Sequence, residues 1–583
     1  MTAVEKLITD HLDLWTAAIK RRSTVGRGSS SKIELYGIKK LRELILELAV
    51  RGLLVPQDPK DEPASELLKK IAAEKTGLVK KGKSKNEKAF PPIAGDGQQK
   101  LPFGWSWTCM AALGEISPRN EVEDCIIASF VPMPFISTRF DGKHDHESKT
   151  WSEIKKGYTH FADGDVAIAK ITPCFENSKA AIFSGLHNGV GAGTTELHVV
   201  RPYGEFVSRG YLLLYLKSPQ FLRVGESRMT GSAGQKRVPT EFFSFNPLPL
   251  PPLAEQHRIV AKADELMALC DQLERQTDTS LSAHKTLVET LLNALTGAAD
   301  QTQFDSSWQR IAEHFDTLFT TEESIDQLKQ TILQLGVMGK LVQQDPNDEP
   351  ASELLKQMAE EKAQLIKEKK IRNSRPLVAI ADDEKFMQLP AGWTFARLND
   401  VGDWGAGATP SRNSPELYGG HIPWFKSGEL VADYIYQSEE TVTELALKRA
   451  SLRYNNVGDV LIAMYGATIG KTAILSVPAT TNQAVCACTP FSGLESTYLL
   501  LLLKAYRPRF IGMGAGGAQP NISREKIIET VVAVPPNTEQ RRIVAKVDEM
   551  MALCDQLKSS LSDAQVTQLH LADALTDKTL ARA

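Results

Sequence analysis

The chain has 583 residues, of which 42% are hydrophobic and 24% are charged, and its formal net charge is −3. This length is too great for one hydrophobic core and predicts about four structural units. The nearly neutral charge argues against a protein that binds nucleic acid alone through a strongly basic surface.

The sequence has no apolar run of the roughly 18 residues that a membrane-spanning helix needs. The N-terminus carries acidic residues and lacks the apolar core of a signal peptide. The seven cysteines include no C-x-x-C pair. We therefore expect a reduced, cytoplasmic chain that contains no metal site.

The first predicted element is a helical segment over residues 1–75, part of which the chain repeats. Leu41–Lys75 and Leu328–Lys362 share the block QDPxDEPASELLK. Its second proline opens a helix whose first turn carries carboxylates near the positive end of the helix dipole. We call the two copies the foot segments, and no catalytic motif is visible in them.

A linker follows each foot segment. Residues 76–100 are rich in Lys, Gly and Pro, and residues 371–388 are charged. Both compositions are typical of a mobile tether. In the alternative interpretation, the lysines of the first linker contact DNA phosphates.

Two modules follow the linkers, over residues 101–252 and 389–536, and each opens with the signature L-P-x-G-W. Both are predicted to be rich in β-strands with some helix. They diverge strongly but align at G-D-V-x-I-A and at a glycine-rich loop, Gly231–Val238 in the first module and Gly514–Ile522 in the second. A shared framework with different loops is typical of two binding modules with different targets.

Each module ends in a Pro-Pro pair that precedes a predicted long helix. Glu255–Leu273 returns almost unchanged as Glu539–Leu557, and we call these copies the rods. The first helix is expected to reach about Leu295, roughly 60 Å from its start. It belongs to a central helical region, residues 253–370, and the second rod to a C-terminal helix, residues 537–583. The heptad-like stripe that predicts coiled-coil packing and partner docking is Ile259, Leu266 and Leu273, repeated as Ile543, Met550 and Leu557. Two unrelated amphipathic helices would share only their apolar positions, whereas these copies also share their polar faces.

The chain offers no convincing catalytic motif. Gly466–Thr472 resembles a phosphate-binding loop, but it is one residue short, and the next residues favour a strand where a helix is required. A hairpin turn is the better interpretation. Asn246–Pro249 lacks the second proline and the aromatic residue of the adenine methyltransferase motif, and the eleven histidines form no metal-binding pattern.

The order L-P-x-G-W, G-D-V, glycine-rich loop and P-P-x-x-E-Q-x-R-I-V occurs twice. It resembles the specificity subunit of Type I restriction-modification enzymes over nearly the whole chain. The resemblance implies an α+β fold with two pseudo-twofold-related target recognition domains. Long antiparallel coiled-coil helices separate them, and residues 1–100 are an N-terminal helical extension that many members lack.

The resemblance also implies a non-catalytic subunit that directs methylation and restriction. Each module would read one half of a bipartite site in double-stranded DNA, and the helices would set the spacing. Two modification subunits would dock on the helices and methylate adenine N6 with S-adenosylmethionine. Two restriction subunits would use ATP and Mg, and the chain itself would hold no cofactor.

Base edges suit particular side chains, since Arg or Lys pairs with guanine and Asn or Gln with adenine. For any single loop residue, simple exposure to solvent is an equally good explanation. The DNA-binding candidates are Arg119, Asn120, Gln235, Lys236 and Arg237 in the first module and Arg412, Asn413, Lys471, Gln519, Asn521 and Arg524 in the second. The weak overall charge is compatible with DNA binding if the modification subunits supply most of the phosphate contacts.

One alternative function is a coiled-coil scaffold that binds only proteins, which would explain the rods but not two divergent modules. The order of the repeats gives a further expectation. The first rod is followed directly by the second foot segment. If a pseudo-twofold axis relates the two repeats, the second rod must contact an equivalent foot segment, and only residues 1–75 can supply it. We therefore expect these residues to pack on the C-terminal helix near Leu557–Leu575, with the two termini close together.

Overall fold

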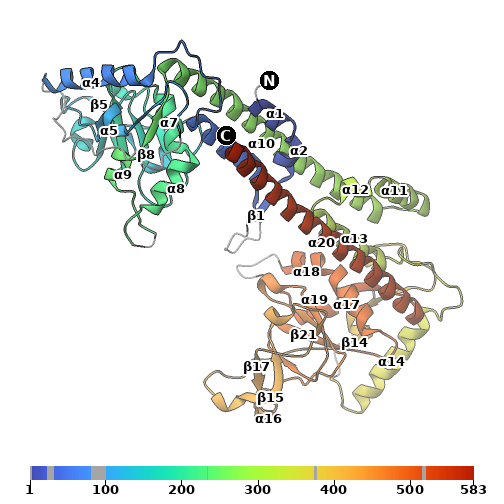
Figure 1. Ribbon diagram of the computed structural model, residues 1–583. Helices are drawn as coiled ribbons and strands as arrows, with labels where there is room; N and C mark the ends of the chain where they lie inside the picture. Colours follow the sequence, from blue (N-terminus) through green and yellow to red (C-terminus); the bar gives the residue numbers. More distant parts are fainter. Residues whose placement is uncertain are drawn as a thin grey trace. The chain divides into compact units, whose positions relative to one another are not determined.

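The computed structural model describes residues 3–22, 32–80, 100–232, 234–372, 377–514 and 520–582. The chain divides into two compact units, of which unit 1 is Met1–Leu281 with Asp563–Ala583 and unit 2 is Ser282–Ser562 (Figure 1). Two long helices belong to both units. Helix α10 (Leu253–Thr296) begins in unit 1 and ends in unit 2, whereas α20 (Asn537–Arg582) begins in unit 2 and ends in unit 1. The end of α10 confirms the expected length of the first rod helix.

The other elements of unit 1 follow in chain order. They are α1 (Ala3–Thr9), α2 (Leu12–Ala17), β1 (Lys20–Arg22), β2 (Lys32–Glu34), α3 (Tyr36–Val50), α4 (Ala64–Lys80), β3 (Ser106–Thr108), α5 (Met110–Leu113), β4 (Gly114–Ile116), β5 (Ile127–Val131), β6 (Glu147–Thr150), α6 (Trp151–Ile154), β7 (Thr159–Ala162), β8 (Val166–Ala169), β9 (Ala180–Ile182), β10 (Val190–Gly193), β11 (Leu197–Pro202), α7 (Arg209–Lys217), α8 (Pro219–Ser227), α9 (Thr240–Phe245) and β12 (Leu248–Leu250).

Unit 2 repeats this order with differences in the module. Its elements are α11 (Gln301–Glu313), α12 (Phe315–Leu318), α13 (Glu322–Val337), α14 (Ala351–Lys367), β13 (Thr394–Arg397), α15 (Leu398–Val401), β14 (Gly402–Ala406), β15 (Tyr418–Phe425), β16 (Tyr434–Ile435), β17 (Glu440–Val442), α16 (Glu444–Arg449), β18 (Val460–Ala463), β19 (Thr472–Leu475), β20 (Thr480–Thr481), β21 (Val485–Pro490), α17 (Ser496–Ala505), α18 (Arg507–Gly514), α19 (Arg524–Ile528) and β22 (Val531–Val534). Among the described helices, none combines the length and the apolar character that crossing a bilayer requires.

Each module has a two-stranded sheet, β12-β3 or β13-β22, and two larger sheets, of which one is shared and the other differs. The shared sheet has the order β4-β11-β8-β9 in the first module and β14-β21-β18-β19-β16 in the second. The second sheet is β6-β5-β10-β7 in the first module but β17-β15-β20 in the second. Mixed helices and sheets in each unit confirm the α+β prediction, and the shared sheet explains why the modules align at G-D-V-x-I-A, which leads into β8 and β18.

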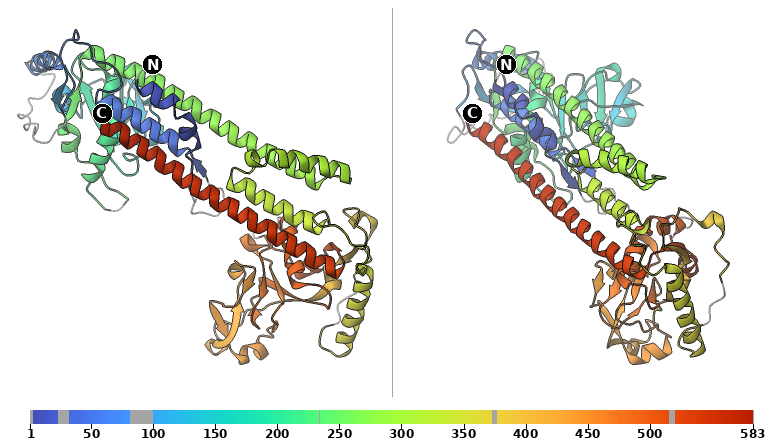
Figure 2. Two further views of the ribbon diagram at one scale, coloured as in Figure 1. Left: turned by 45° about the vertical axis from the view of Figure 1, so that its right-hand side comes forward. Right: turned by 90° about the vertical axis from the view of Figure 1, so that its right-hand side faces the viewer.

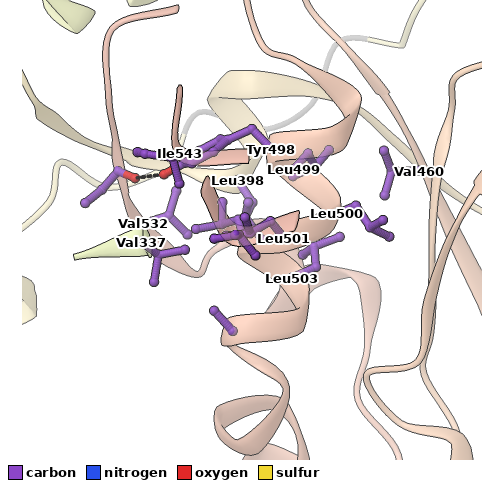
Figure 3. Close-up of a cluster of buried hydrophobic side chains, with 14 of the residues drawn as sticks. Val337, Leu398, Val460, Tyr498, Leu499, Leu500, Leu501, Leu503, Val532 and Ile543 are labelled. Carbon is purple, nitrogen blue, oxygen red and sulfur yellow. Dashed lines mark hydrogen bonds between the residues drawn. The ribbon is translucent and has the colours of Figure 1, made fainter. Parts of the chain in front are cut away.

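An apolar helix joins the second module to the helices around it. Helix α17 contains the run YLLLLLKA and is buried on nearly all sides, as a helix without a polar face must be. Figure 3 shows its leucines close to Val460 of β18, Val337 of α13 and Ile543 of α20. The second predicted linker is not a free tether, because Glu384 pairs with Arg397 at 2.9 Å.

The L-P-x-G-W signature anchors each module to a rod. The indole Nε1 of Trp105 donates to the carboxylate of Glu255 at 3.1 Å, and the amide of Gln57 donates to the same carboxylate at 3.1 Å. Glu255 lies in the first turn of α10 and is 1% exposed. Burial raises the pKa of Glu255, and the two donors oppose that rise. One buried carboxylate therefore ties together the foot segment, the module and the rod.

Unit 2 contains the same anchor. Trp393 donates to Glu539 at 3.0 Å, and Gln344 donates to it at 3.2 Å. The foot segments turn sharply toward these tryptophans at Gly52 and Gly339, where φ is +74° and +69°. A Cβ atom on Gly339 would lie only 2.5 Å from Pro390, so this turn requires glycine.

In unit 1, helix α3 contacts the beginning of α10 and the end of α20 (Figure 2). Arg42 Nη2 donates to Asp271 of α10 at 2.5 Å, and the hydroxyl of Tyr36 donates to Asp573 of α20 at 2.7 Å. The buried core of the unit also includes Ala572. The expectation that residues 1–75 pack on the C-terminal helix is confirmed.

Helix α13 makes the matching contacts in unit 2. Lys329 pairs with Asp555 near the beginning of α20, and Gln327 donates to Glu289 of α10 at 3.0 Å. Each foot helix thus holds the start of one rod helix and the end of the other. The N-terminal extension is therefore the counterpart of the second foot segment and not an accessory.

The rod stripe packs inside the chain. Ile259, Leu266 and Ile543 are 0–2% exposed, and the remaining three stripe residues are partly buried against the same cores, namely Leu273, Met550 and Leu557. Residues as buried as the first three hold the chain's own helices together. Ile259, Leu266 and Ile543 are therefore covered by the chain's own residues, whereas Leu273, Met550 and Leu557 remain partly exposed.

We expect Trp105→Phe to destabilise unit 1, because it removes the indole N–H that donates to Glu255. A hydrogen bond to a charged group contributes about 1.5–3 kcal/mol, and the free energy of unfolding in urea should fall by about that amount. Glu255→Gln completes a double-mutant cycle. Fully additive losses would mean that the indole and the carboxylate are not coupled.

The closed arrangement of unit 1 also predicts tolerance to circular permutation. Joining the chain ends by a flexible linker and reopening the chain between Lys80 and Lys100 should preserve assembly and DNA specificity, because α3 keeps its contacts with α10 and α20. Gel filtration and binding assays measure both properties. A control reopened inside α3 should fail, and equal failure of both permutants would contradict the prediction.

Candidate nucleic-acid interface

Two loops of the first module are joined by backbone hydrogen bonds. The first loop connects β8 to β9, and the second is the glycine-rich loop before α9. Val238 N donates to the carbonyl oxygen of Lys170 at 2.8 Å, and Thr172 N donates to that of Lys236 at 3.0 Å. Thr230 and Arg237 pair across the glycine-rich loop, which makes it a hairpin-like projection.

The second module joins the equivalent loops in the same way. Ile522 N donates to the carbonyl oxygen of Met464 at 2.9 Å, and Gly466 N donates to that of Pro520 at 2.8 Å. Tyr465 and Asn521 form the bridge between these two hydrogen bonds. The modules therefore share this site at the level of single hydrogen bonds. Gln519 lies outside the described residues.

The glycine-rich loop of the first module presents three candidate readers together. Gln235 and Lys236 are exposed, and Arg237 is half-buried. The Nη2 atom of Arg237 lies 2.8 Å from Glu196 Oε1, and its Nε atom lies 2.9 Å from Glu196 Oε2. This pairing lowers the pKa of Glu196, so the carboxylate stays ionised at neutral pH.

Arg119 and Asn120 lie apart from this loop. Asn120 donates to the carbonyl oxygen of Phe161 at 2.7 Å and accepts from Arg201 at 2.9 Å. Arg201 lies five residues along β11 from Glu196, so the two groups of candidates are separated by roughly 16 Å of strand. The side chain of Asn120 links strands of the module, and only Arg119 of this pair is exposed.

In the second module, Arg412 is held by a carboxylate and by two aromatic rings. Its Nη1 atom lies 2.6 Å from Glu440, and its guanidinium carbon lies 4.6 Å from the ring centroid of Tyr418 and 5.4 Å from that of Trp424. Arg412, followed by Lys426, lowers the pKa of Glu440 to about 2. Asn413, the next residue, is exposed.

Lys471 lies in a hairpin and not in a phosphate-binding loop. Strands β18 and β19 pair antiparallel, and Lys471 directly precedes β19. No helix follows, so the hairpin interpretation is confirmed. Lys471 is half-buried in the turn between the two strands.

Asn521 and Arg524 flank the start of α19. Asn521 is exposed, and the described residues give its side-chain amide no hydrogen-bond partner. Arg524 is half-buried, and its Nη1 atom donates to the carbonyl oxygen of Trp404 at 3.1 Å. These two residues therefore differ, since Asn521 is open to a ligand and Arg524 also supports the fold.

The sequence did not reveal the carboxylates that hold the arginines. Glu196 is 41 residues from Arg237, and Glu440 is 28 residues from Arg412. Ion pairs over such separations leave no pattern in a single sequence. The shared hydrogen bonds between the loops were equally hidden, although the aligned glycine-rich loops indicated where they would lie.

A comparison with protein families agrees with this duplicated arrangement. The family described as Type I restriction modification DNA specificity domain matches residues 133–283 and 390–566. Two Escherichia coli proteins, the EcoAI and EcoEI specificity subunits of Type I restriction enzymes, are each 51% identical to this chain, and the alignments cover 99% of this chain and 99% and 100% of the relatives. A crystal structure of the HsdS subunit from Thermoanaerobacter tengcongensis aligns with 83% of this chain and 98% of its own at 20% identity, with a TM-score of 0.40. Because the identity to both relatives extends over essentially the whole sequence, the chain belongs to the specificity subunits of Type I restriction enzymes.

Proposed function

We propose that each module reads one half of a bipartite site in double-stranded DNA and that the two long helices fix the spacing between the halves. The observation that carries this proposal is the pair of joined loops, which have the same backbone hydrogen bonds and different exposed side chains. Base edges in the major groove are distinguished by such side chains, whereas the framework only has to present them.

As a specificity subunit, the chain recognises DNA and is not the catalytic subunit of its enzyme. It acts in a complex with other restriction-modification subunits and DNA. We propose two modification subunits, because the chain presents two copies of foot segment and rod. They would bind S-adenosylmethionine and methylate adenine N6, and two restriction subunits would use ATP and Mg. The complex would act in the cytoplasm, and the chain would hold no cofactor.

Long-read methylation mapping tests this function in a host that carries the chain and its partners. The expected result is methylation at one bipartite motif. Asn521→Ala, or Gln519→Ala beside it, should weaken recognition of one half of that motif by about 1–3 kcal/mol, the contribution of a bidentate base contact. Equal losses for changes in either half would contradict the assignment of one module to each half.

The duplicated foot and rod also predict the stoichiometry of the complex. We expect the chain to co-purify with two copies of a methyltransferase subunit, which native mass spectrometry can count. Substituting exposed residues of one rod should remove one copy, because the equivalent surface of the other rod is unchanged. A stable chain with no affinity for that subunit would contradict the prediction.

A further inference from the structure

Arg237 and Asn521 occupy the same structural position in the two modules. Arg237 bridges to Ile171, and Asn521 bridges to Tyr465, each between the two hydrogen bonds that join the loops. The residues that precede β11 and β21 also correspond. Lys170 N donates to the carbonyl oxygen of Glu196 at 2.9 Å, and Met464 N donates to that of Ala484 at 2.8 Å. Glu196 therefore corresponds to Ala484.

The guanidinium of Arg237 is held with one edge free. A guanidinium has five N–H donors in a fixed plane. Glu196 takes one from Nε and one from Nη2, and the carbonyl oxygen of Gln235 accepts one from Nη1 at 3.2 Å. Of the five donors, one on each terminal nitrogen is left without a partner among the described residues. Since the side chain is 43% exposed, this edge can be reached by a ligand.

The second module presents an amide at this position. Asn521 is exposed, its amide has no partner among the described residues, and the neighbouring Ala484 supplies no carboxylate to hold a cation. An amide offers one donor and one acceptor side by side, which match the N6 and N7 atoms of adenine. Two parallel guanidinium donors instead match the O6 and N7 acceptors of guanine.

We propose that this shared position determines specificity in both modules, so that Arg237 reads a guanine in one half-site and Asn521 reads an adenine in the other. Glu196 is a positioning residue, because it fixes the plane of the guanidinium without reaching the base. This inference rests on the proposed reading of one half-site by each module and adds which base each position selects.

Reciprocal exchange tests the inference. Each variant of the full chain, assembled with its modification subunits, selects from a library of randomised DNA duplexes, and sequencing gives the base preference at every position. Arg237→Asn should change one guanine to adenine in one half-site. Asn521→Arg, made together with Ala484→Glu to supply the carboxylate, should change one adenine to guanine in the other half-site. Discrimination at these positions should change by about 5- to 150-fold, which corresponds to one bidentate contact.

Two further variants distinguish a loss of base preference from a loss of stability. Arg237→Lys keeps the positive charge but loses the paired donors, so guanine preference should fall while affinity for unrelated DNA is retained. Glu196→Ala should lower the preference at the same single position, with an unchanged urea midpoint. A general loss of affinity without a change at one position would show that Glu196 is only structural and would overturn its role.

The possible outcomes are distinct. If the original chain selects a bipartite motif and neither exchange alters any base preference, the inference is wrong while the proposed function stands. If the original complex selects no motif, the proposed function itself fails. A change confined to one position in each half, in the stated directions, supports the inference.

Discussion

The structure depends on a buried carboxylate at the start of each rod. Glu255 and Glu539 are each 1% exposed, and each accepts hydrogen bonds from a tryptophan and a glutamine that belong to different segments. A carboxylate removed from water is costly unless such donors are present. Module, foot segment and rod therefore have to assemble around it together, and this explains why these short signatures recur while the modules diverge.

The rods connect this local constraint to DNA recognition. Each foot helix contacts the first half of one long helix and the second half of the other, and the contacts are equivalent in the two units. A rigid helix can then keep two reading loops at a set spacing, as proposed here. The backbone hydrogen bonds that join the two loops of each module do not depend on which side chains the loops carry, so the side chains can differ between the modules.

Much of this organisation could be predicted from the sequence, because each sequence motif occurs twice and the two copies can be compared. The repeated rod and foot segments predicted the two long helices. They also predicted that residues 1–75 pack on the C-terminal helix. The candidate site was harder to predict. Asn120 looked like a base reader but links strands, and the partners of Arg237 and Arg412 come from distant segments. A single sequence records the type and spacing of residues, but not which side chains meet after folding.

The placement of residues 563–582 has a consequence for synthesis of the chain. Unit 2 is continuous in sequence, whereas unit 1 is closed by the end of α20. When Asp573 leaves the ribosome to meet Tyr36, all of unit 2 has already been made. Contacts between residues more than 500 positions apart form slowly, because a long loop must close first. Unit 2 is therefore expected to complete its folding first. Unit 1 is expected to complete its folding only after residues 563–582 have been synthesised.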